Sequence, residues 1–298
     1  MSIDPKPVPE PGHLFCFGLG YTGTLLALRL MGNGWRVSGS VRKKETLARA
    51  SDSGIRAYLF DGNSPLADPD NTFAGVTHLL GSIPPSEAGD PALIHHGDDL
   101  RSSKTLRWVG YLSTPAVYGD RQGGVAREED KPNPVSARGK RRLTAERAWV
   151  KAFDGTRVSV QAFRLAGIYG PGRCALDQVR AGTARIVDKP GQVFNRIHVD
   201  DITKILIASM ARPDHTRIYN VADTEACPSG DVIRHACFLL GVDPPAPIAF
   251  ESAELSPMAR SFYSECKRLD TNRLTKELGV TLTHPTYREG LAAILGAT

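Results

Sequence analysis

The chain has 298 residues, of which 41% are hydrophobic and 23% are charged, and it carries a formal net charge of +5. This length and composition are typical of an ordinary globular protein with one large domain, or with a domain and a smaller appendage. No apolar stretch approaches the ~20 residues of a membrane-spanning helix. The sequence also lacks a basic patch interleaved with aromatic residues, the pattern that would indicate DNA or RNA binding.

The N-terminal segment and the cysteines indicate a cytoplasmic protein. Residues Met1 to Pro11 contain four prolines and lack the apolar core of a secretion signal. The five cysteines are dispersed and show no C-x-x-C spacing: Cys16, Cys174, Cys227, Cys237 and Cys266. An odd, dispersed set predicts free thiols in a reducing compartment, and it argues against a disulfide framework or a zinc site.

The first predicted element is a buried strand that runs directly into a glycine-rich turn. The apolar residues 14–17 form the strand, residues 24–30 form a helix, and the turn between them reads Gly18-Leu19-Gly20-Tyr21-Thr22-Gly23. In this G-x-G-x-x-G fingerprint the first glycine permits the tight turn, the second lets the backbone approach a pyrophosphate, and the third lets the helix pack on the strand. The N–H groups at the start of the helix then receive the phosphate. The sequence therefore predicts a dinucleotide site at Gly18, Gly20, Tyr21, Thr22 and Gly23.

Strands and helices alternate along about the next 200 residues. Further strands are predicted at 35–40, 55–60, 76–80, 107–112, 158–163 and 217–221, and helices at 45–50, 139–153 and 202–210. Such alternation predicts an α/β fold with a doubly wound parallel sheet of the Rossmann type. We expect one extended unit over residues 1–298, in which residues 12–170 mainly bind the dinucleotide. Residues 171–298 are expected to form mainly a small C-terminal α/β substrate cap, with sheet-completing segments near 193–222.

The densest basic run, Arg138-Gly139-Lys140-Arg141-Arg142, lies at the start of the helix predicted for 139–153. It has two interpretations: a solvated helix face, or a positive rim that attracts an anionic cofactor or substrate. The same alternatives are open for Arg173, Arg185 and Arg196, because each could meet a substrate phosphate or carboxylate or simply face solvent.

Five blocks of sequence, in chain order, resemble the extended short-chain dehydrogenase/reductase family of the NAD-dependent epimerase/dehydratase type. They are Ser113–Gly119 (STPAVYG), Phe163–Arg173 (FRLAGIYGPGR), Arg196–Asp201 (RIHVDD), Tyr219–Val221 and Tyr287–Leu291. The resemblance covers nearly the whole chain, and the blocks are specific for the fold and not for the reaction. It implies an NAD(P)-binding protein with a sugar-nucleotide-like small molecule as substrate.

The resemblance also implies where a cofactor contacts this chain. In members that prefer NAD the second strand ends in an acid that accepts a hydrogen bond from the ribose 2′-OH, whereas this strand ends in Ser40-Val41-Arg42-Lys43-Lys44. Arg42 and Lys43 suit a 2′-phosphate, so NADP is the expected cofactor and NAD the alternative. An exposed helix start is the other interpretation, although cations are unfavourable there without an anion to meet. The remaining implied cofactor contacts are Asp61, Gly62, Ser82, Ile83, Pro84, Ser113, Lys140, Leu165 and Gly167.

The catalytic pattern of that family, a Ser/Thr followed by Tyr-x-x-x-Lys, is incomplete in this chain. Thr114 matches the hydroxyl that orients a substrate oxygen and Lys140 matches the lysine, but Ser136 stands where the tyrosine is expected. A phenol has a pKa of about 10 that a nearby ammonium can lower, whereas a serine hydroxyl needs a separate base. Ser136 can also be interpreted as the N-cap of the helix that follows. Tyr118 and Tyr169 are the candidate substitutes for the missing phenol.

Two further expectations concern metals and oligomers. His198, Asp200 and Asp201 precede the helix predicted for 202–210, and we interpret them as capping and anchoring groups, so no metal site is expected. The connection from Ser86 to Leu106 is short for a family whose members usually place a long, dimer-forming helix there. We therefore expect a monomer or a dimer of another arrangement.

Two functions from different classes remain open. One is an NADP-dependent oxidoreductase or epimerase with a non-standard acid/base, for which the candidate catalytic residues are Thr114, Ser136, Lys140 and Tyr118. The alternative is a non-catalytic NADP-binding protein that acts as a redox sensor or a partner-binding subunit. Neither function involves a nucleic acid or a membrane as partner.

Overall fold

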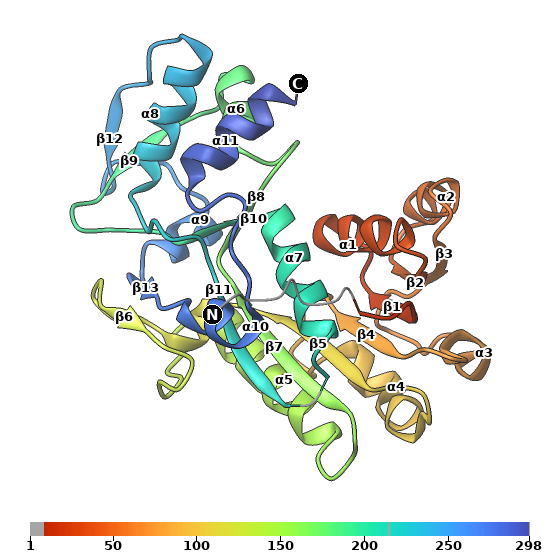
Figure 1. Ribbon diagram of the computed structural model, residues 1–298. Helices are drawn as coiled ribbons and strands as arrows, with labels where there is room; N and C mark the ends of the chain where they lie inside the picture. Colours follow the sequence, from red (N-terminus) through yellow and green to blue (C-terminus); the bar gives the residue numbers. More distant parts are fainter. Residues whose placement is uncertain (1–8, 214, 298) are drawn as a thin grey trace, which may run out of the picture. The chain divides into compact units, whose positions relative to one another are not determined.

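The computed structural model describes residues 9–213 and 215–297, so most of the segment Met1 to Pro11 lies outside the described residues. The chain divides into two compact units, and each is assembled from several segments (Figure 1). Unit 1 contains the chain up to Thr114, then Ala137–Arg164 and Thr203–Tyr219. Unit 2 contains Pro115–Ser136, Leu165–Ile202 and the chain from Asn220 onward.

The centre of unit 1 is a seven-stranded sheet in the order β11-β7-β5-β4-β1-β2-β3. The strands are β1 (His13–Phe17), β2 (Arg36–Val41), β3 (Arg56–Leu59), β4 (His78–Gly81), β5 (Trp108–Ser113), β7 (Ser159–Leu165) and β11 (Arg217–Val221). Strand β1 pairs in parallel with β2 on one side and with β4 on the other. The strand order therefore reverses at β1, which is the position where doubly wound sheets bind nucleotides. The predicted α/β fold with a doubly wound parallel sheet is confirmed.

Helices cover both faces of this sheet. Figure 1 shows α1 (Tyr21–Met31) and most of α7 (Val199–Met210) on one face, and α4 (Pro91–Ser102) and α5 (Ala137–Ala152) on the other. The short helices α2 (Lys44–Asp52) and α3 (Pro69–Phe73) connect strands. Helix α4 occupies 12 residues of the connection from Ser86 to Leu106, and the expectation of a monomer or a dimer of another arrangement stays a prediction. Asp90 starts this helix by accepting a hydrogen bond from the N–H of Ala92 at 2.9 Å.

Aromatic side chains fill much of the core of unit 1. The ring of Phe15 lies edge-on to Phe17 and to Phe73, at centroid distances of 4.9 and 5.1 Å. Trp149 of α5 is fully buried and donates from Nε1 to the carboxylate of Asp90 at 3.0 Å. Buried aromatic pairs of this geometry add stability beyond the area that they bury, so they help to stabilise the sheet.

Unit 2 contains three short parallel strand pairs and a separate core. The pairs are β8 (Gly167–Tyr169) with β10 (Arg196–His198), β9 (Ile186–Asp188) with β12 (Pro247–Ala249), and β6 (Val125–Ala126) with β13 (Arg268–Leu269). Its helices are α6 (Ala175–Arg180), α8 (Ser229–Leu240), α9 (Pro257–Phe262), α10 (Asn272–Leu278) and α11 (Tyr287–Gly296). The core includes Leu176, Ile233, Ala236, Tyr287 and Leu291.

Two expectations from composition can be compared with these elements. Within residues 9–213 and 215–297, no helix is both long and apolar enough to cross a bilayer. All five cysteines are free thiols, as predicted, and four of them are buried.

Candidate functional site

The glycine turn joins β1 to α1, and each of its glycines meets different surroundings. Gly18 has a φ of +98°, a left-handed conformation that side chains disfavour. A Cβ atom at Gly23 would lie only 2.7 Å from the carbonyl oxygen of Gly18, so α1 packs closely on the turn. A Cβ atom at Gly20 would meet no atom within 4 Å, so the backbone there faces open space. The turn thus combines two sterically required glycines with one that leaves room for a ligand.

Helix α1 starts without a side-chain cap. Its N-cap residue is Gly20, and no acidic side chain lies in its first turn, which contains Tyr21 and Thr22. The first N–H groups of an α-helix have no acceptor within the helix, and the helix dipole makes this end positive. The start of α1 therefore suits an anion such as a pyrophosphate.

The end of β2 accepts hydrogen bonds from the glycine turn and is followed by two exposed cationic side chains. The N–H of Gly18 donates to Ser40 Oγ at 3.1 Å, and the N–H of Leu19 donates to the carbonyl oxygen of Ser40 at 2.8 Å. Arg42 and Lys43 follow the strand and are exposed. Among the residues described, no ion pair or hydrogen bond engages either side chain. They stand before α2, whose N-cap residue, Lys43, supplies no cap bond.

The predicted contacts after β3 and β4 lie at the same edge, because the strands are parallel. Asp61 is exposed, and hydrogen bonds from the backbone and side chain of Asn63 hold the pKa of its carboxyl below the usual range. Gly62 has a φ of +86°. After β4, the N–H of Ser82 donates to the carbonyl oxygen of Phe17 at 2.9 Å. Residues 82–84, including Ile83 and Pro84, remain partly or fully exposed.

Strand β5 ends in Ser113, and Thr114 follows it in a half-buried position. The hydroxyl of Ser113 is buried and donates to Glu146 Oε2 at 2.7 Å, so this side chain is already engaged within the protein. Lys140 is exposed in the first turn of α5. The predicted contacts Leu165 and Gly167 belong to segments of unit 2.

Glu146 and Arg164 are polar residues of this region that the sequence reasoning missed. Arg164 donates to Glu146 from Nη2 at 2.6 Å and from Nε at 3.2 Å. The side chains of Glu146 and Arg164 are only 4% and 1% exposed. The charged residue inside the apolar block Ala162–Leu165 was the available signal, because a charge that is buried in a strand requires a partner.

The candidate acid/base residues outside unit 1 differ in their surroundings. Ser136 is half-buried and directly precedes α5. Tyr118 ends a 3₁₀ turn at Pro115–Tyr118, is fully buried and donates to Asn220 Oδ1 at 2.7 Å. Tyr169 donates to the carbonyl oxygen of Thr286 at 3.3 Å, and burial raises its pKa. The catalytic roles of Thr114, Ser136, Lys140 and Tyr118 stay predictions.

Two histidines and an aspartate meet at the start of α7. Asp200 Oδ2 lies 3.8 Å from His198 Nδ1 and 3.8 Å from His284 Nε2. The Nδ1 atom of His198 accepts the N–H of Asp200 at 3.2 Å. One ligand atom from each of the three residues lies within 4.8 Å of the others, a spacing that could hold a metal ion. Asp201 accepts the N–H groups of Thr283 and His284 at 2.6 and 2.9 Å. The bonds to Asp201 fit an anchoring role, while the expectation that no metal binds here stays a prediction.

Unit 2 also contains a buried carboxyl that has a single hydrogen-bond partner among the described residues. Asp223 is 5% exposed, and its Oδ1 accepts the N–H of Glu225 at 3.2 Å. Within the described chain, its Oδ2 accepts no hydrogen bond. Burial raises the pKa of Asp223 to about 7.

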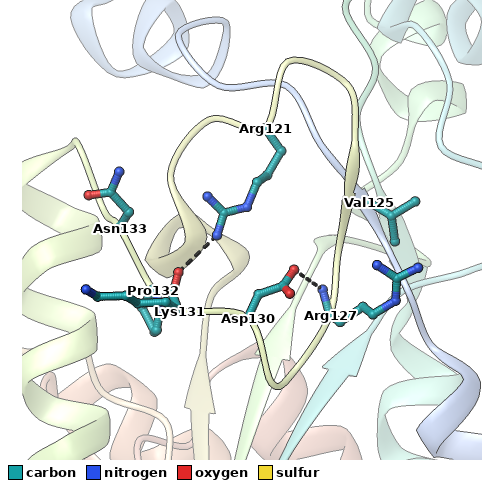
Figure 2. A pocket seen from close by; sticks show the side chains of 7 residues that line it. All are labelled: Arg121, Val125, Arg127, Asp130, Lys131, Pro132 and Asn133. Atoms are coloured by element: carbon teal, nitrogen blue, oxygen red, sulfur yellow. Dashed lines mark hydrogen bonds between the residues drawn. The ribbon is translucent and has the colours of Figure 1, made fainter.

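A surface depression of about 670 Å³ in unit 2 is distinct from the glycine turn. It is lined by Arg121, Val125, Arg127, Asp130, Lys131, Pro132 and Asn133 (Figure 2). Arg121 reaches across the loop and donates to the carbonyl oxygen of Lys131, while the side chains of Arg127 and Lys131 point to opposite sides. Because its cations diverge and no aromatic side chain lines it, this depression does not resemble a dinucleotide site.

No protein-family model matches the chain. Protein YeeZ of Escherichia coli (strain K12) is 30% identical over 277 residues, which cover 90% of this chain and 94% of YeeZ. The ADP-L-glycero-D-manno-heptose-6-epimerase of Cupriavidus pinatubonensis is 26% identical over 215 residues, which cover 61% of this chain and 63% of the epimerase.

Solved structures share the fold over nearly the whole chain. A functionally unknown conserved protein from Silicibacter pomeroyi DSS has 45% sequence identity and a TM-score of 0.89, with 96% of this chain and 99% of that chain covered. MoeE5, solved in complex with UDP-glucose and NAD, has 23% identity and a TM-score of 0.76, with 96% and 97% covered. Other neighbours include a dTDP-glucose 4,6-dehydratase and a UDP-glucuronic acid 4-epimerase, each solved with NAD, and at 12% and 17% identity their likeness to this chain concerns the fold alone.

Proposed function

The chain belongs to the family of Escherichia coli YeeZ, and from that premise we propose that it binds NADP and acts as an oxidoreductase or epimerase. The observation that carries the proposal is the glycine turn, with a helix start that has no cap and a position, Gly20, that faces open space. A pyrophosphate fits that position, because N–H groups and the helix dipole both favour an anion there.

The preference for NADP rests on the end of β2. Arg42 and Lys43 are exposed cations without an anionic partner among the described residues, and they lie where an adenosine ribose reaches in this fold. A guanidinium fork matches the geometry of a phosphate and forms charge-assisted hydrogen bonds with it. The 2′-phosphate of NADP would supply the missing anion, and NAD would not.

A calorimetric titration tests this preference directly. A hydrogen bond to a charged group contributes about 1.5–3 kcal/mol, so wild type should bind NADPH more tightly than NADH, and Arg42→Glu should erase or invert the difference. Arg157→Glu is the matched control, because Arg157 is an exposed arginine before β7, at the opposite edge of the sheet. Equal affinities of the wild type for the two cofactors would contradict the NADP assignment.

The proposed reaction differs in its proton transfer from that of the short-chain dehydrogenases/reductases that carry Tyr-x-x-x-Lys. When bound, the nicotinamide supplies the redox chemistry, and the protein supplies orientation and the proton. We assign to Thr114 the orientation of a substrate oxygen and to Lys140 a charge beside the cofactor. Ser136 cannot replace a phenol without a separate base, so the acid/base group is non-standard. The proposed substrate is a sugar-nucleotide-like molecule, which the complex of the structurally similar MoeE5 with UDP-glucose supports.

The second candidate function is a sensor or partner-binding subunit that binds NADP without turnover. Two observations favour it: a serine at position 136, and a Tyr118 phenol that is buried and bonded to Asn220. Ser136→Tyr separates the two functions. Positioned acid/base groups contribute about 10²–10⁴-fold, so this variant should raise a weak carbonyl reduction if the protein is an enzyme with an incomplete proton relay.

The other possible results either show that another residue is the acid or favour the sensor function. One possible result is that wild type reduces a carbonyl substrate rapidly, that Thr114→Val abolishes this activity and that Ser136→Tyr leaves it unchanged. In that case another residue is the acid. If neither wild type nor Ser136→Tyr turns over any carbonyl compound while NADPH binds, the sensor is the better description.

A further inference from the structure

We infer that Glu146 is a positioning residue of the proposed cofactor site, where it holds the end of β5 against the helix that carries Lys140. The inference rests on the proposed function, because Thr114 and Lys140 receive their roles there. It concerns three buried groups within unit 1: the Ser113 hydroxyl, the Glu146 carboxylate and the Arg164 guanidinium.

The three groups come from three elements that meet at one level of the sheet. Ser113 is the last residue of β5, and Arg164 of β7 is its direct partner in the parallel register. Glu146 projects from α5, six residues after Lys140. The Glu146 carboxylate therefore connects the ends of β5 and β7 to α5, next to Thr114, the first residue after β5.

Both carboxylate oxygens of Glu146 take part in these hydrogen bonds. Glu146 Oε1 accepts from Arg164 Nη2 at 2.6 Å, while Oε2 accepts from Arg164 Nε at 3.2 Å and from Ser113 Oγ at 2.7 Å. A two-pronged contact between arginine and a carboxylate fixes orientation as well as distance. A second contact holds the same helix to the same strand, because Arg142 donates to the carbonyl oxygen of Leu112 at 2.8 Å.

Stability alone does not account for this arrangement. A buried ion pair gains little over apolar side chains of similar volume, since the cost of removing both charges from water offsets their attraction. A purely structural contact between α5 and β5 could thus be apolar, as is the contact of Trp149 on α5 with the ring of Tyr111 on β5. A directional bond to Ser113 is needed only where the position of the next residue, Thr114, must be fixed.

The test compares two ligands that share the adenosine half of the cofactor. NADPH carries the nicotinamide half, which Thr114 and Lys140 would contact, and adenosine 2′,5′-bisphosphate lacks it. In Ser113→Ala, which removes one hydroxyl, we expect the affinity for NADPH to fall roughly tenfold, because Thr114 is then less firmly positioned. This change corresponds to about 1.4 kcal/mol, no more than the lost hydrogen bond to Glu146 contributes. The affinity for adenosine 2′,5′-bisphosphate should be unchanged. A general loosening of the fold would lower both affinities together.

Two further variants keep the test decisive. In the double variant Glu146→Leu with Arg164→Leu, which removes both charges together, we expect a melting temperature near that of the wild type and the same selective loss for NADPH. Trp149→Phe is the matched control on α5: it removes the bond to Asp90, and should lower the melting temperature while both affinities persist.

The outcomes distinguish this inference from the proposed function. If wild type binds neither ligand, the proposed cofactor site fails and the inference fails with it. If wild type binds both ligands but Ser113→Ala and the double variant lower both affinities equally or neither of them, Glu146 is structural only and the inference alone is wrong.

Discussion

Two buried carboxyl groups, Glu146 in unit 1 and Asp223 in unit 2, differ in the number of their hydrogen-bond partners. Glu146 in unit 1 has an arginine and a serine hydroxyl around it, and both of its oxygens accept hydrogen bonds. Asp223 in unit 2 is equally buried, but one of its oxygens accepts no hydrogen bond from the described residues, and its pKa is raised to about 7. Both oxygens of Glu146 are paired inside the protein, whereas the Asp223 carboxyl stays protonated until the pH approaches neutrality.

The difference shows that burial alone does not make a polar group costly; the number of its partners decides the cost. A carboxylate with a guanidinium and a hydroxyl is a fixed part of the framework, and removing its partner leaves an uncompensated charge. A carboxyl without such partners remains protonated and neutral up to a higher pH. Three predictions break or sharpen this contrast, in order of their expected effects.

The largest effect is expected when the Glu146 carboxylate is removed alone. Glu146→Leu leaves Arg164 buried without its counter-charge, which should lower the free energy of unfolding by about 3–5 kcal/mol in urea denaturation. Most of that loss should return in the double variant with Arg164→Leu, because no charge then remains in the interior. A single variant as stable as the wild type would show that the pair is not a fixed part of the framework.

The second prediction concerns the pH dependence that Asp223 imposes. The folded pKa of about 7 lies above the ordinary value of 3.8, so folding binds a proton between these values. This group's contribution is most favourable below pH 4 and is lost as the pH rises through 7. Asp223→Asn should therefore be more stable than wild type by roughly 2–4 kcal/mol at pH 8, and nearly equal to it at pH 4.

Urea midpoints measured from pH 4 to pH 8 would show this divergence. Asp243→Asn, at an exposed carboxyl of the same unit, is the matched control and should follow the wild type throughout. Parallel curves for Asp223→Asn and the wild type would mean that Asp223 is not held neutral by burial.

The smallest effect is expected for a neutral buried pair, the phenol of Tyr118 and the side chain of Asn220. Tyr118→Phe removes the donor at 2.7 Å from Asn220 Oδ1 but leaves the amide bonded to Ala126 and Asp270. We expect a loss of about 1 kcal/mol in the free energy of unfolding. A loss as large as that of Glu146→Leu would show that neutral and charged pairs are equivalent in this chain.

The sequence predicted the sheet well, because each buried strand is a short apolar run that ends at a turn. The strand at residues 217–221 was predicted without error, and β1 was predicted to within one residue. Helix α4 was missed because Pro91–Ser102 mixes histidines and aspartates with few apolar residues. Asp90 followed by Pro91 was the available signal, since an N-cap aspartate before proline is a common helix start.

The candidate site was predictable where it depends on local sequence. The glycine turn requires particular backbone conformations within six residues, so the roles of Gly18 and Gly23 follow from the amino-acid sequence alone. Glu146 could not be paired with Ser113, because 33 residues separate them and only the folded sheet brings α5 to the end of β5. The same limit applies to Tyr118, whose hydrogen bond to Asn220 spans 102 residues.

The interleaving of the two units constrains how the protein is made in the cell. The polypeptide passes between the units after residues 114, 136, 164, 202 and 219. Strand β11, at the edge of the sheet, is synthesised only when about three quarters of the chain has left the ribosome. Domains usually fold as units and in order during synthesis, but here the early strands must wait with an open edge, and open strand edges are where chains aggregate. The nascent chain is therefore expected to depend on chaperones more than a protein whose N-terminal domain closes on itself.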